Sequence, residues 1–359
     1  MHDKAPRDHE ARSRARGALY GLAIGDALGM PTQLLSRAEI RTRWGGLLHG
    51  FEPAPPGHPI AAGLPAGAIT DDTEQAVLLG RLLVRGGGTV DPGELAEALV
   101  RWERDMTARG SRDLLGPSTK RAVAAVLAGT PLEEAGASGA TNGAAMRIPP
   151  LGIAVPLNLA DAQAGPATPA RLSALVDQVV AVSMVTHNTS LALAGAAAVA
   201  AAVSAGVSGA SITAATTIAV AAAQIAAGRG HWVAGADVAA RIQWATGLVA
   251  GRDRAEAAEL IYTLVGTSLA TQESVPAAFA VLAAVPGDPW QACLLAASLG
   301  GDGDTIGAMA GAVAGACHGV GAFPPHALAV IDAHGLGLTT LADDLYALRS
   351  AKVSRGWAG

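Results

Sequence analysis

Apolar residues recur at helical spacing along most of this chain of 359 residues. In the stretch after Asp72, residues 73–84, Ala, Val and Leu return every three or four positions, which is typical of a helix packed on one face. Residues 17–29 follow the same spacing until Pro31, which cannot easily continue a helix. Similar patterns predict further helices at residues 92–105, from about residue 118, and at 172–185, 190–205, 212–227, 237–248, 254–263, 275–285, 290–299 and 306–319.

A different pattern covers residues 45–67, which are crowded with Gly and Pro and follow no period. We therefore expect a long loop between the helices on either side. A loop of this length within a compact domain is often a lid over a binding site.

The composition agrees with an all-α fold. Apolar residues make up 50% of the chain and are mostly Ala with Val, Leu and Ile, while aromatic residues make up only 3%. These proportions favour closely packed helices over a β-sandwich. No change in composition divides the chain, so we predict a single compact multi-helix domain over residues 16–350. Residues 1–15, which are polar and rich in charge, are expected to form a flexible N-terminal segment.

The distribution of charge limits the kinds of partner. A formal net charge of −5 argues against a general nucleic-acid-binding surface. Residues 190–227 carry no charge, but small residues dominate them and residues 206–211 interrupt them, so buried helices are favoured over a membrane span. Cys293 and Cys317 lie in apolar helical patterns without CxxC spacing, and no apolar signal segment follows Met1. We expect buried thiols in a cytoplasmic protein without a membrane partner.

Two acidic clusters lie far apart in the sequence, Thr70-Asp71-Asp72-Thr73 and Gly301-Asp302-Gly303-Asp304-Thr305. Each precedes an apolar helix, so its carboxylates fall in the first turn, where free backbone N–H groups favour negative charge. A single acid or hydroxyl is enough to cap a helix, so either cluster alone is compatible with capping. Together they predict two halves of one site.

The helix after the second cluster carries Gly307, Gly311, Gly315 and Gly319 at intervals of four. A helix face without side chains allows another helix to approach closely, and this would press the acidic turn against its partner. The same spacing is typical of membrane-helix dimers, but the acids at the helix entrance make that the weaker alternative.

Four carboxylates gathered without a counter-charge cannot all be ionised, and a bound cation would resolve this conflict. Neither cluster contains His or Cys, and oxygen ligands favour Mg²⁺, Mn²⁺ or Ca²⁺ over Zn²⁺. Four acids and two threonines suffice for two ions bridged by one carboxylate.

Five motifs occur in the order found in ADP-ribosylglycohydrolases, and the chain resembles that family from about Arg16 to Gly319. The motifs are Gly25-Asp26-Ala27-Leu28-Gly29, Thr70-Asp71-Asp72-Thr73, Asn142-Gly143-Ala144-Ala145-Met146-Arg147, Thr186-His187 and Gly301-Asp302-Gly303-Asp304-Thr305. The resemblance implies an all-α domain with two divalent cations, Mg²⁺ or Mn²⁺, at the base of a cleft. It also implies hydrolysis of the bond between ADP-ribose and an acceptor, which is a protein side chain or a small molecule.

By position, the resemblance implies six metal ligands: Thr70, Asp71, Asp72, Asp302, Asp304 and Thr305. In that family the metals hold the ribose diol beside the scissile C1–N or C1–O bond. Asp71 and Asp302 are then the candidate catalytic residues that orient the attacking water or accept its proton.

The resemblance also implies a set of substrate-binding residues. The loop Ser138, Gly139, Ala140, Thr141, Asn142 and Gly143 matches a segment that wraps phosphate and ribose, where small residues would expose backbone N–H groups to an anion. The remaining candidates are Asp26, Gln33, Asp113 and His187. For several of them a structural role stays open: an ordinary loop at 138–143, a helix cap at Asp113 and a core histidine at 187.

The chain departs from the family pattern at three places: the change at Gly303 affects loop stiffness and leaves the metal ligands in place, whereas Gln33 and the altered loop at 140–141 keep other functions open. Gln33 stands where many members have a Glu that acts in proton transfer, and an amide cannot do this. Gly303 stands where Thr is common, and Ala140 and Thr141 stand where some members have an aromatic residue and a Gly. An N-glycosidase acting on a smaller ribosyl compound or nucleoside, and a non-catalytic ADP-ribose-binding relative, are therefore the alternatives.

Overall fold

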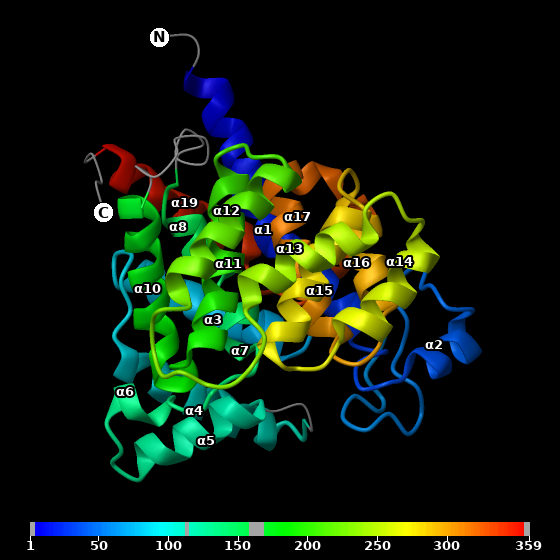
Figure 1. Ribbon diagram of the computed structural model, residues 1–359, viewed down its shortest axis with the longest axis horizontal. Helices are drawn as coiled ribbons and strands as arrows, with labels where there is room; N and C mark the ends of the chain where they lie inside the picture. Colours follow the sequence, from blue (N-terminus) through cyan, green and yellow to red (C-terminus); the bar gives the residue numbers. More distant parts are fainter. Residues whose placement is uncertain (1–3, 112–114, 158–168, 355–359) are drawn as a thin grey trace.

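The structure, a computed structural model, describes residues 4–111, 115–157 and 169–354. Within those ranges the chain is all-α, with only two isolated bridges of extended backbone, Thr141 with Ala270 and Thr189 with His231. The helices shown in Figure 1 are α1 (Lys4–Gly29), α2 (Arg37–Trp44), α3 (Asp71–Arg85), α4 (Pro92–Ala108), α5 (Pro117–Leu127), α6 (Leu132–Ala135), α7 (Gly143–Arg147), α8 (Pro149–Ala154), α10 (Pro169–His187), α11 (Ser190–Val207), α12 (Ile212–Ala226), α13 (Val238–Val249), α14 (Arg254–Leu260), the π-helix η2 (Ile261–Val265), α15 (Thr271–Ala284), α16 (Pro289–Ala297), α17 (Gly303–His318), the 3₁₀ helix η3 (Val320–Ala322), α18 (Pro325–Asp332) and α19 (Leu338–Ser354).

Two glycine-rich helices, α1 and α17, pack against each other at the centre of the molecule. The predicted glycines of α17 meet glycines of α1 that are also spaced by four. A Cβ atom at Gly21 would lie 2.1 Å from the carbonyl oxygen of Gly311, and one at Gly25 would lie 2.0 Å from that of Gly307. Side chains at these positions are therefore excluded, and the two backbones are in direct contact. The prediction of a closely approaching partner helix is confirmed.

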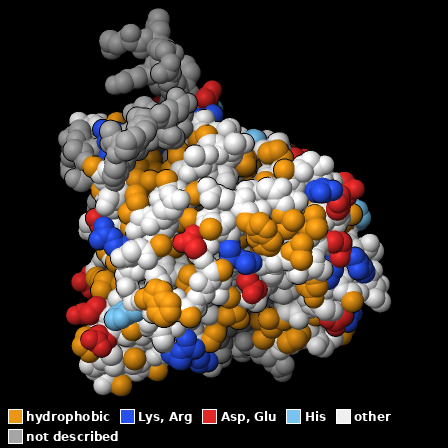
Figure 2. Space-filling model, viewed as in Figure 1, with side chains coloured by type: hydrophobic (Ala, Val, Ile, Leu, Met, Phe, Trp, Pro, Cys, Tyr) orange, Lys and Arg blue, Asp and Glu red, His pale blue; other side chains and the backbone are white. Residues whose placement is uncertain are grey.

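The uncharged helix α11 passes through the core. It is long and apolar enough to cross a membrane, but every residue of that stretch is buried inside the protein. Neighbouring helices α12, α8, α10 and α17 cover it, so it packs as the core helix that its sequence predicted. Figure 2 shows the face over α11, α12, α13 and α15, where apolar side chains are interspersed with charged ones.

The N-terminal segment differs from the expectation. Residues 1–15 were predicted to be flexible, but α1 already begins at Lys4 and continues without a break to Gly29. Ala15 is fully buried, and the Tyr346 hydroxyl donates to Asp8 Oδ1 at 2.9 Å. Packing against the C-terminal helix α19 stabilises a polar stretch that has little apolar pattern of its own.

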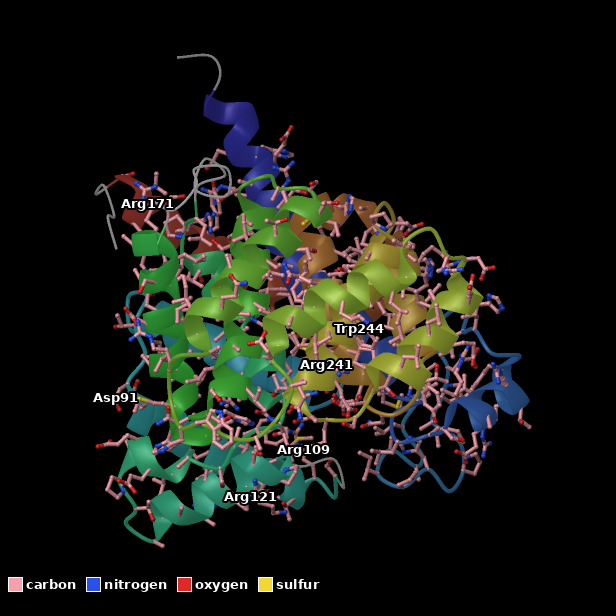
Figure 3. The ribbon with its side chains drawn as sticks, in the orientation of Figure 1. Asp91, Arg109, Arg121, Arg171, Arg241 and Trp244 are labelled. Atoms are coloured by element: carbon pink, nitrogen blue, oxygen red, sulfur yellow. The ribbon has the colours of Figure 1, made fainter. Side chains whose placement is uncertain are left out.

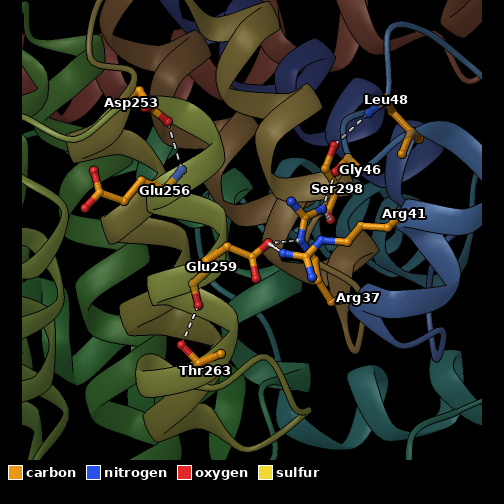
Figure 4. A network of polar contacts seen from close by, with 9 residues as sticks. All are labelled: Arg37, Arg41, Gly46, Leu48, Asp253, Glu256, Glu259, Thr263 and Ser298. Carbon is orange, nitrogen blue, oxygen red and sulfur yellow. Dashed lines mark hydrogen bonds and ion pairs between the residues drawn. The ribbon is translucent and has the colours of Figure 1, made fainter.

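Residues 45–67 form no helix, as predicted, and the helix α2 before them is anchored to the body of the protein (Figure 4). The buried Arg37 donates to Glu259 Oε1 at 2.9 Å and to the Ser298 carbonyl at 2.5 Å. Arg41 also pairs with Glu259 Oε1, at 2.5 Å. The segment that leads into α2 lies beside the turn that precedes Asp302, because the Leu34 N–H donates to the Gly301 carbonyl at 2.6 Å and the Gly301 N–H donates to the Leu35 carbonyl at 2.9 Å.

Candidate active site

The two acidic clusters open onto one cavity of about 290 Å³. Its wall combines side chains from loops and helix ends that are distant in sequence. The lining residues are Gln33, Leu34, Ile60, Asp71, Leu115, Gly116, Pro117, Thr119, Lys120, Thr141, Asn142, Gly143, Met146, Leu269, Asp302, Asp304 and Thr305. Four of the six predicted metal ligands are among them.

The first cluster is held in place by Asp26, which is fully buried. Its carboxylate accepts the backbone N–H of Thr70 at 3.0 and 3.1 Å and that of Thr73 at 3.1 Å. It also accepts both threonine hydroxyls, that of Thr70 at 2.8 Å. Burial raises the pKa of Asp26 to about 6, while these hydrogen bonds act in the opposite direction. Asp26 therefore anchors the start of α3 through these hydrogen bonds. The sequence predicted Asp26 as a substrate-binding residue, but its side chain is not part of the cavity wall.

The second cluster follows a turn that only glycine can form. Gly300 and Gly301 have φ of 82° and 65°, and a Cβ atom on them would lie 2.5 Å from the Leu35 carbonyl and 2.3 Å from the Thr267 carbonyl. Gly303 differs, because a Cβ atom there would meet nothing closer than 3.4 Å. Steric limits thus explain Gly300 and Gly301, whereas position 303 has room for a Cβ atom.

The two clusters meet directly. Asp72 Oδ2 lies 3.2 Å from the hydroxyl of Thr70 and 3.2 Å from that of Thr305, which is 233 positions further along the chain. Asp302 Oδ2 accepts from Asn142 Nδ2 at 2.5 Å, which brings the second cluster against the predicted substrate loop. Burial raises the pKa of Asp302, and hydrogen bonds from Asn142 and Thr305 oppose that rise.

The predicted substrate-binding residues fall into two groups. Gln33, Thr141, Asn142 and Gly143 line the cavity, and Asp113 lies outside the described residues. In the rest of the loop, Ser138 is exposed, the Gly139 N–H bonds the Gly136 carbonyl, and the Ala140 carbonyl accepts from Thr271 at 3.2 Å. These three residues belong to the loop but do not line the cavity. The N–H groups of Gly139 and Asn142, which were expected to face an anion, instead donate to the backbone carbonyls of Gly136 and Leu269.

His187 is fully buried behind the cavity wall. Its Nε2 lies 3.0 Å from the hydroxyl of Thr141, and its Nδ1 lies 2.8 Å from that of Thr186. Burial, with the positive charges of Arg147 and Arg121, holds the pKa of His187 well below its usual range, so the ring is neutral. It acts on the cavity through Thr141.

Several residues of the wall carried no signal in the sequence. Leu34 is half exposed at the cavity rim and has a φ of 59°, which is uncommon for a residue with a side chain. Leu269 and Lys120 reach the cavity from a loop and from the first turn of α5. Figure 3 shows two further cations, Arg109 and Arg121, of which Arg121 follows Lys120 on α5. Apolar residues such as Leu34 and Leu269 can be recognised as part of the cavity rim only from the folded structure.

The donor chemistry of the two clusters suits hard divalent cations, because carboxylate and hydroxyl oxygens come from two helix starts that meet at one cavity. In their present orientation no three acidic, His or Cys side chains of the described residues are gathered closely enough to enclose an ion. Asp71 is turned toward Gln75, whose Nε2 lies 2.7 Å from its Oδ2, and Asp302 is turned toward Asn142.

Comparison with known proteins adds independent information. The model of the ADP-ribosylglycohydrolase family matches residues 7–354. YegU of Escherichia coli (strain K12), an uncharacterized protein, is 37% identical over 321 residues, which cover 89% of this chain and 92% of YegU. ADP-ribosyl-[dinitrogen reductase] glycohydrolase of Rhodospirillum rubrum is 27% identical over 337 residues, which cover 89% and 90% of the two chains. A solved structure of an ADP-ribosylglycohydrolase-related protein complex superposes with a TM-score of 0.64 at 25% identity, over 95% of this chain and 99% of that one.

Proposed function

Because this chain belongs to the ADP-ribosylglycohydrolase family, we propose that it is a metal-dependent glycosidase that releases ADP-ribose from an acceptor at the cavity between α3, α5, α7 and α17. The acceptor we favour is a side chain of an ADP-ribosylated protein in the cytoplasm. The relative from Rhodospirillum rubrum, whose name describes action on such a protein, supports this choice of substrate class.

The observation that carries the proposal is the meeting of the two acidic clusters. Asp72 and Thr305 are hydrogen-bonded although they are 233 positions apart in the sequence. Asp71, Asp302 and Asp304 line the same cavity. Cleavage of a glycosidic bond develops positive charge at C1 of the ribose. Carboxylates on the cavity wall would stabilise that charge as it forms.

Thr70, Asp71, Asp72, Asp302, Asp304 and Thr305 would hold two Mg²⁺ or Mn²⁺ ions. When bound, such ions would orient the ribose hydroxyls and lower the pKa of a water molecule. Other side chains of this protein position the two candidate catalytic acids. Asn142 holds the carboxylate of Asp302 and Gln75 holds that of Asp71, so each acid is fixed to orient the attacking water or to accept its proton.

A smaller ribosyl substrate is the alternative that a specific observation favours. Gln33 occupies the cavity wall and cannot transfer a proton to a leaving group. With Gln33 at this position, the leaving group has to depart without protonation or be protonated by another acid. A nucleoside hydrolase reaction therefore remains the second candidate.

The decisive assay measures release of ADP-ribose from arginine-, serine- and DNA-linked substrates with Mg²⁺, Mn²⁺ or EDTA. We expect metal-dependent release from at least one linkage and a loss of about 100-fold or more in Asp304→Ala. Thermal melting with free ADP-ribose separates the alternatives, since a ligand at 100-fold its Kd adds roughly 2.7 kcal/mol to stability. Metal binding without release of ADP-ribose from any substrate would favour the nucleoside hydrolase or a non-catalytic ADP-ribose-binding protein.

A further inference from the structure

A continuous chain of hydrogen-bonded polar groups joins two residues of the cavity wall. It begins at Asp71, passes through Gln75 and Arg147, and reaches Thr141 by way of Thr186 and His187. The four inner members are at most 1% exposed, whereas Asp71 and Thr141 at the two ends line the cavity.

Arg147 occupies the middle of this chain. Its Nη1 lies 3.4 Å from Gln75 Oε1, and its Nη2 donates to Thr186 Oγ1. Burial lowers the pKa of Arg147 to about 10, and the negative charge of Asp71 opposes that shift, so the side chain is a cation at neutral pH. A guanidinium has five N–H donors and no acceptor, so it can only donate hydrogen bonds.

This property fixes the direction of the bonds toward Thr141. Thr186 Oγ1 accepts from Arg147, and its own proton has two acceptors within reach, His187 Nδ1 at 2.8 Å and the Ser183 carbonyl at 3.4 Å. The shorter contact is the stronger hydrogen bond. His187 Nδ1 then accepts, which leaves the ring proton on Nε2 to donate to Thr141 Oγ1 at 3.0 Å.

The same logic applies toward Asp71. Because Gln75 Oε1 faces the guanidinium, Gln75 Nε2 faces Asp71 and donates to Oδ2 at 2.7 Å. The amide is thus oriented by Arg147, and the carboxylate is oriented by the amide.

We propose that Arg147 is a positioning residue that sets the direction of the hydrogen bonds toward both ends of this chain. At one end, Thr141 presents its hydroxyl proton to an acceptor oxygen of the bound ribosyl compound. At the other end, Gln75 holds the carboxylate of Asp71. This inference rests on the proposed function for the identity of the ligand, but the direction of the chain does not depend on it.

The direction is tested in the protein alone by nitrogen-15 NMR of histidine-labelled protein at neutral pH, with His187→Gln used to assign the signal. We expect wild-type His187 to be neutral and protonated at Nε2. In Arg147→Met, and in the nearly isosteric Thr186→Val, the proton is expected to distribute over both nitrogens. The control Arg241→Met removes a half-buried guanidinium on α13 that donates to the Val265 carbonyl, and should leave the His187 signals unchanged. A wild-type ring protonated at Nδ1 would overturn the proposal even if Arg147→Met does not fold.

The Thr141 end is tested by calorimetric titration with ADP-ribose. Thr141→Val, which removes the hydroxyl at nearly constant volume, should weaken binding about tenfold, and Thr141→Ser should restore it. Equal affinities for wild type and Thr141→Val would reject the donor role. If wild type binds no ADP-ribose, the proposed function is rejected, and the NMR result alone decides the direction of the chain.

The Asp71 end is tested by titration with Mn²⁺. Gln75→Leu should lower Mn²⁺ affinity about tenfold, because groups that orient metal ligands commonly have effects of this size. Gln243→Leu, on the exposed side of α13, is the matched control. Unchanged Mn²⁺ affinity in Gln75→Leu would show that the amide does not position Asp71.

Discussion

His58 connects the 45–67 loop to the cavity. Its Nδ1 accepts the N–H groups of Ile60 at 3.3 Å and Ala61 at 2.9 Å, so its proton is on Nε2, which donates to the Gln33 carbonyl at 2.8 Å. Only the neutral ring makes all of these bonds. Burial lowers the pKa of His58, and the charge of Arg43 adds to this effect, although the bond to Gln33 opposes it.

This lowered pKa predicts a pH-dependent stability. The folded state favours the neutral ring, so the contribution of His58 is fully present above the unfolded pKa of about 6.5 and is lost as pH falls through the lower folded pKa. His58→Gln should therefore be less stable than wild type at pH 8, and the difference should shrink by pH 5. Melting temperatures at a series of pH values test this. The same series for His49→Gln, at an exposed position, should show no such convergence, and a constant gap for His58→Gln would contradict the prediction.

At the scale of residues, the sequence identified those whose chemistry is unusual for their position. Two acids and a hydroxyl at a helix start exceed what capping requires, and this led to Asp71, Asp302 and Asp304 on the cavity wall. Residues with common chemistry escaped notice. Leu269 is an ordinary apolar residue until the fold places it at the rim. Gln75 had a signal, because residues four apart on a helix are neighbours and Asp71 lies four positions before it.

At the scale of elements, the contact between α1 and α17 makes a strong prediction. A methyl group at Gly311 would lie 2.0 Å from the Gly21 carbonyl oxygen, and the backbone of α1 has to move to admit it. We expect Gly311→Ala to lower the free energy of unfolding by about 3 kcal/mol, the upper part of the usual range for overpacking. Urea denaturation followed by circular dichroism measures this loss.

The matched control for this change is Gly247→Ala in α13. Gly247 is exposed, and a Cβ atom there would have no neighbour within 4 Å. Because alanine is the better helix former, this variant should gain up to about 1 kcal/mol. A gain in Gly311→Ala similar to that in Gly247→Ala would show that helix propensity, and not the contact between the helices, determines the effect.

Helix prediction succeeded where burial imposes a period and failed where other forces stabilise the helix. α2, with the sequence RAEIRTRW, has only Arg37 and Ile40 buried, so it has almost no apolar pattern. The local sequence signal for α2 is the capping box of Ser36 and Glu39, which marks the start of a helix without any apolar pattern. α19 was not predicted either, and α1 extends over a polar stretch, because these two helices stabilise each other through contacts such as Tyr346 with Asp8.

At the scale of the whole molecule, the buried Arg349 of α19 fastens the C-terminal helix to the core. Its guanidinium donates to the carbonyl of Val155 at 2.7 Å and to that of Ser204 at 3.0 Å. The Val155 carbonyl also accepts the Ser204 hydroxyl and the Ser204 carbonyl also accepts the Ser208 N–H, so loss of Arg349 removes the charged donor but leaves each carbonyl one partner. Hydrogen bonds from a charged group contribute about 1.5–3 kcal/mol.

This arrangement provides a test of the single domain predicted for residues 16–350. We expect Arg349→Met to lower the melting temperature by roughly 5 °C, in proportion to a loss of about 3 kcal/mol. If the chain is one cooperative unit, far-ultraviolet circular dichroism and tryptophan fluorescence should shift together. α19 contacts α1, α3 and α8, and five of the six tryptophans lie before it in the chain: Trp44, Trp102, Trp232, Trp244 and Trp290. Asp26 on α1 and Thr305 on α17 contribute to one site from opposite ends of the sequence, so the cavity cannot persist in a partly unfolded chain. Two separate transitions, with the fluorescence unchanged while the helical signal falls, would instead mean that the C-terminal helix unfolds independently of the site.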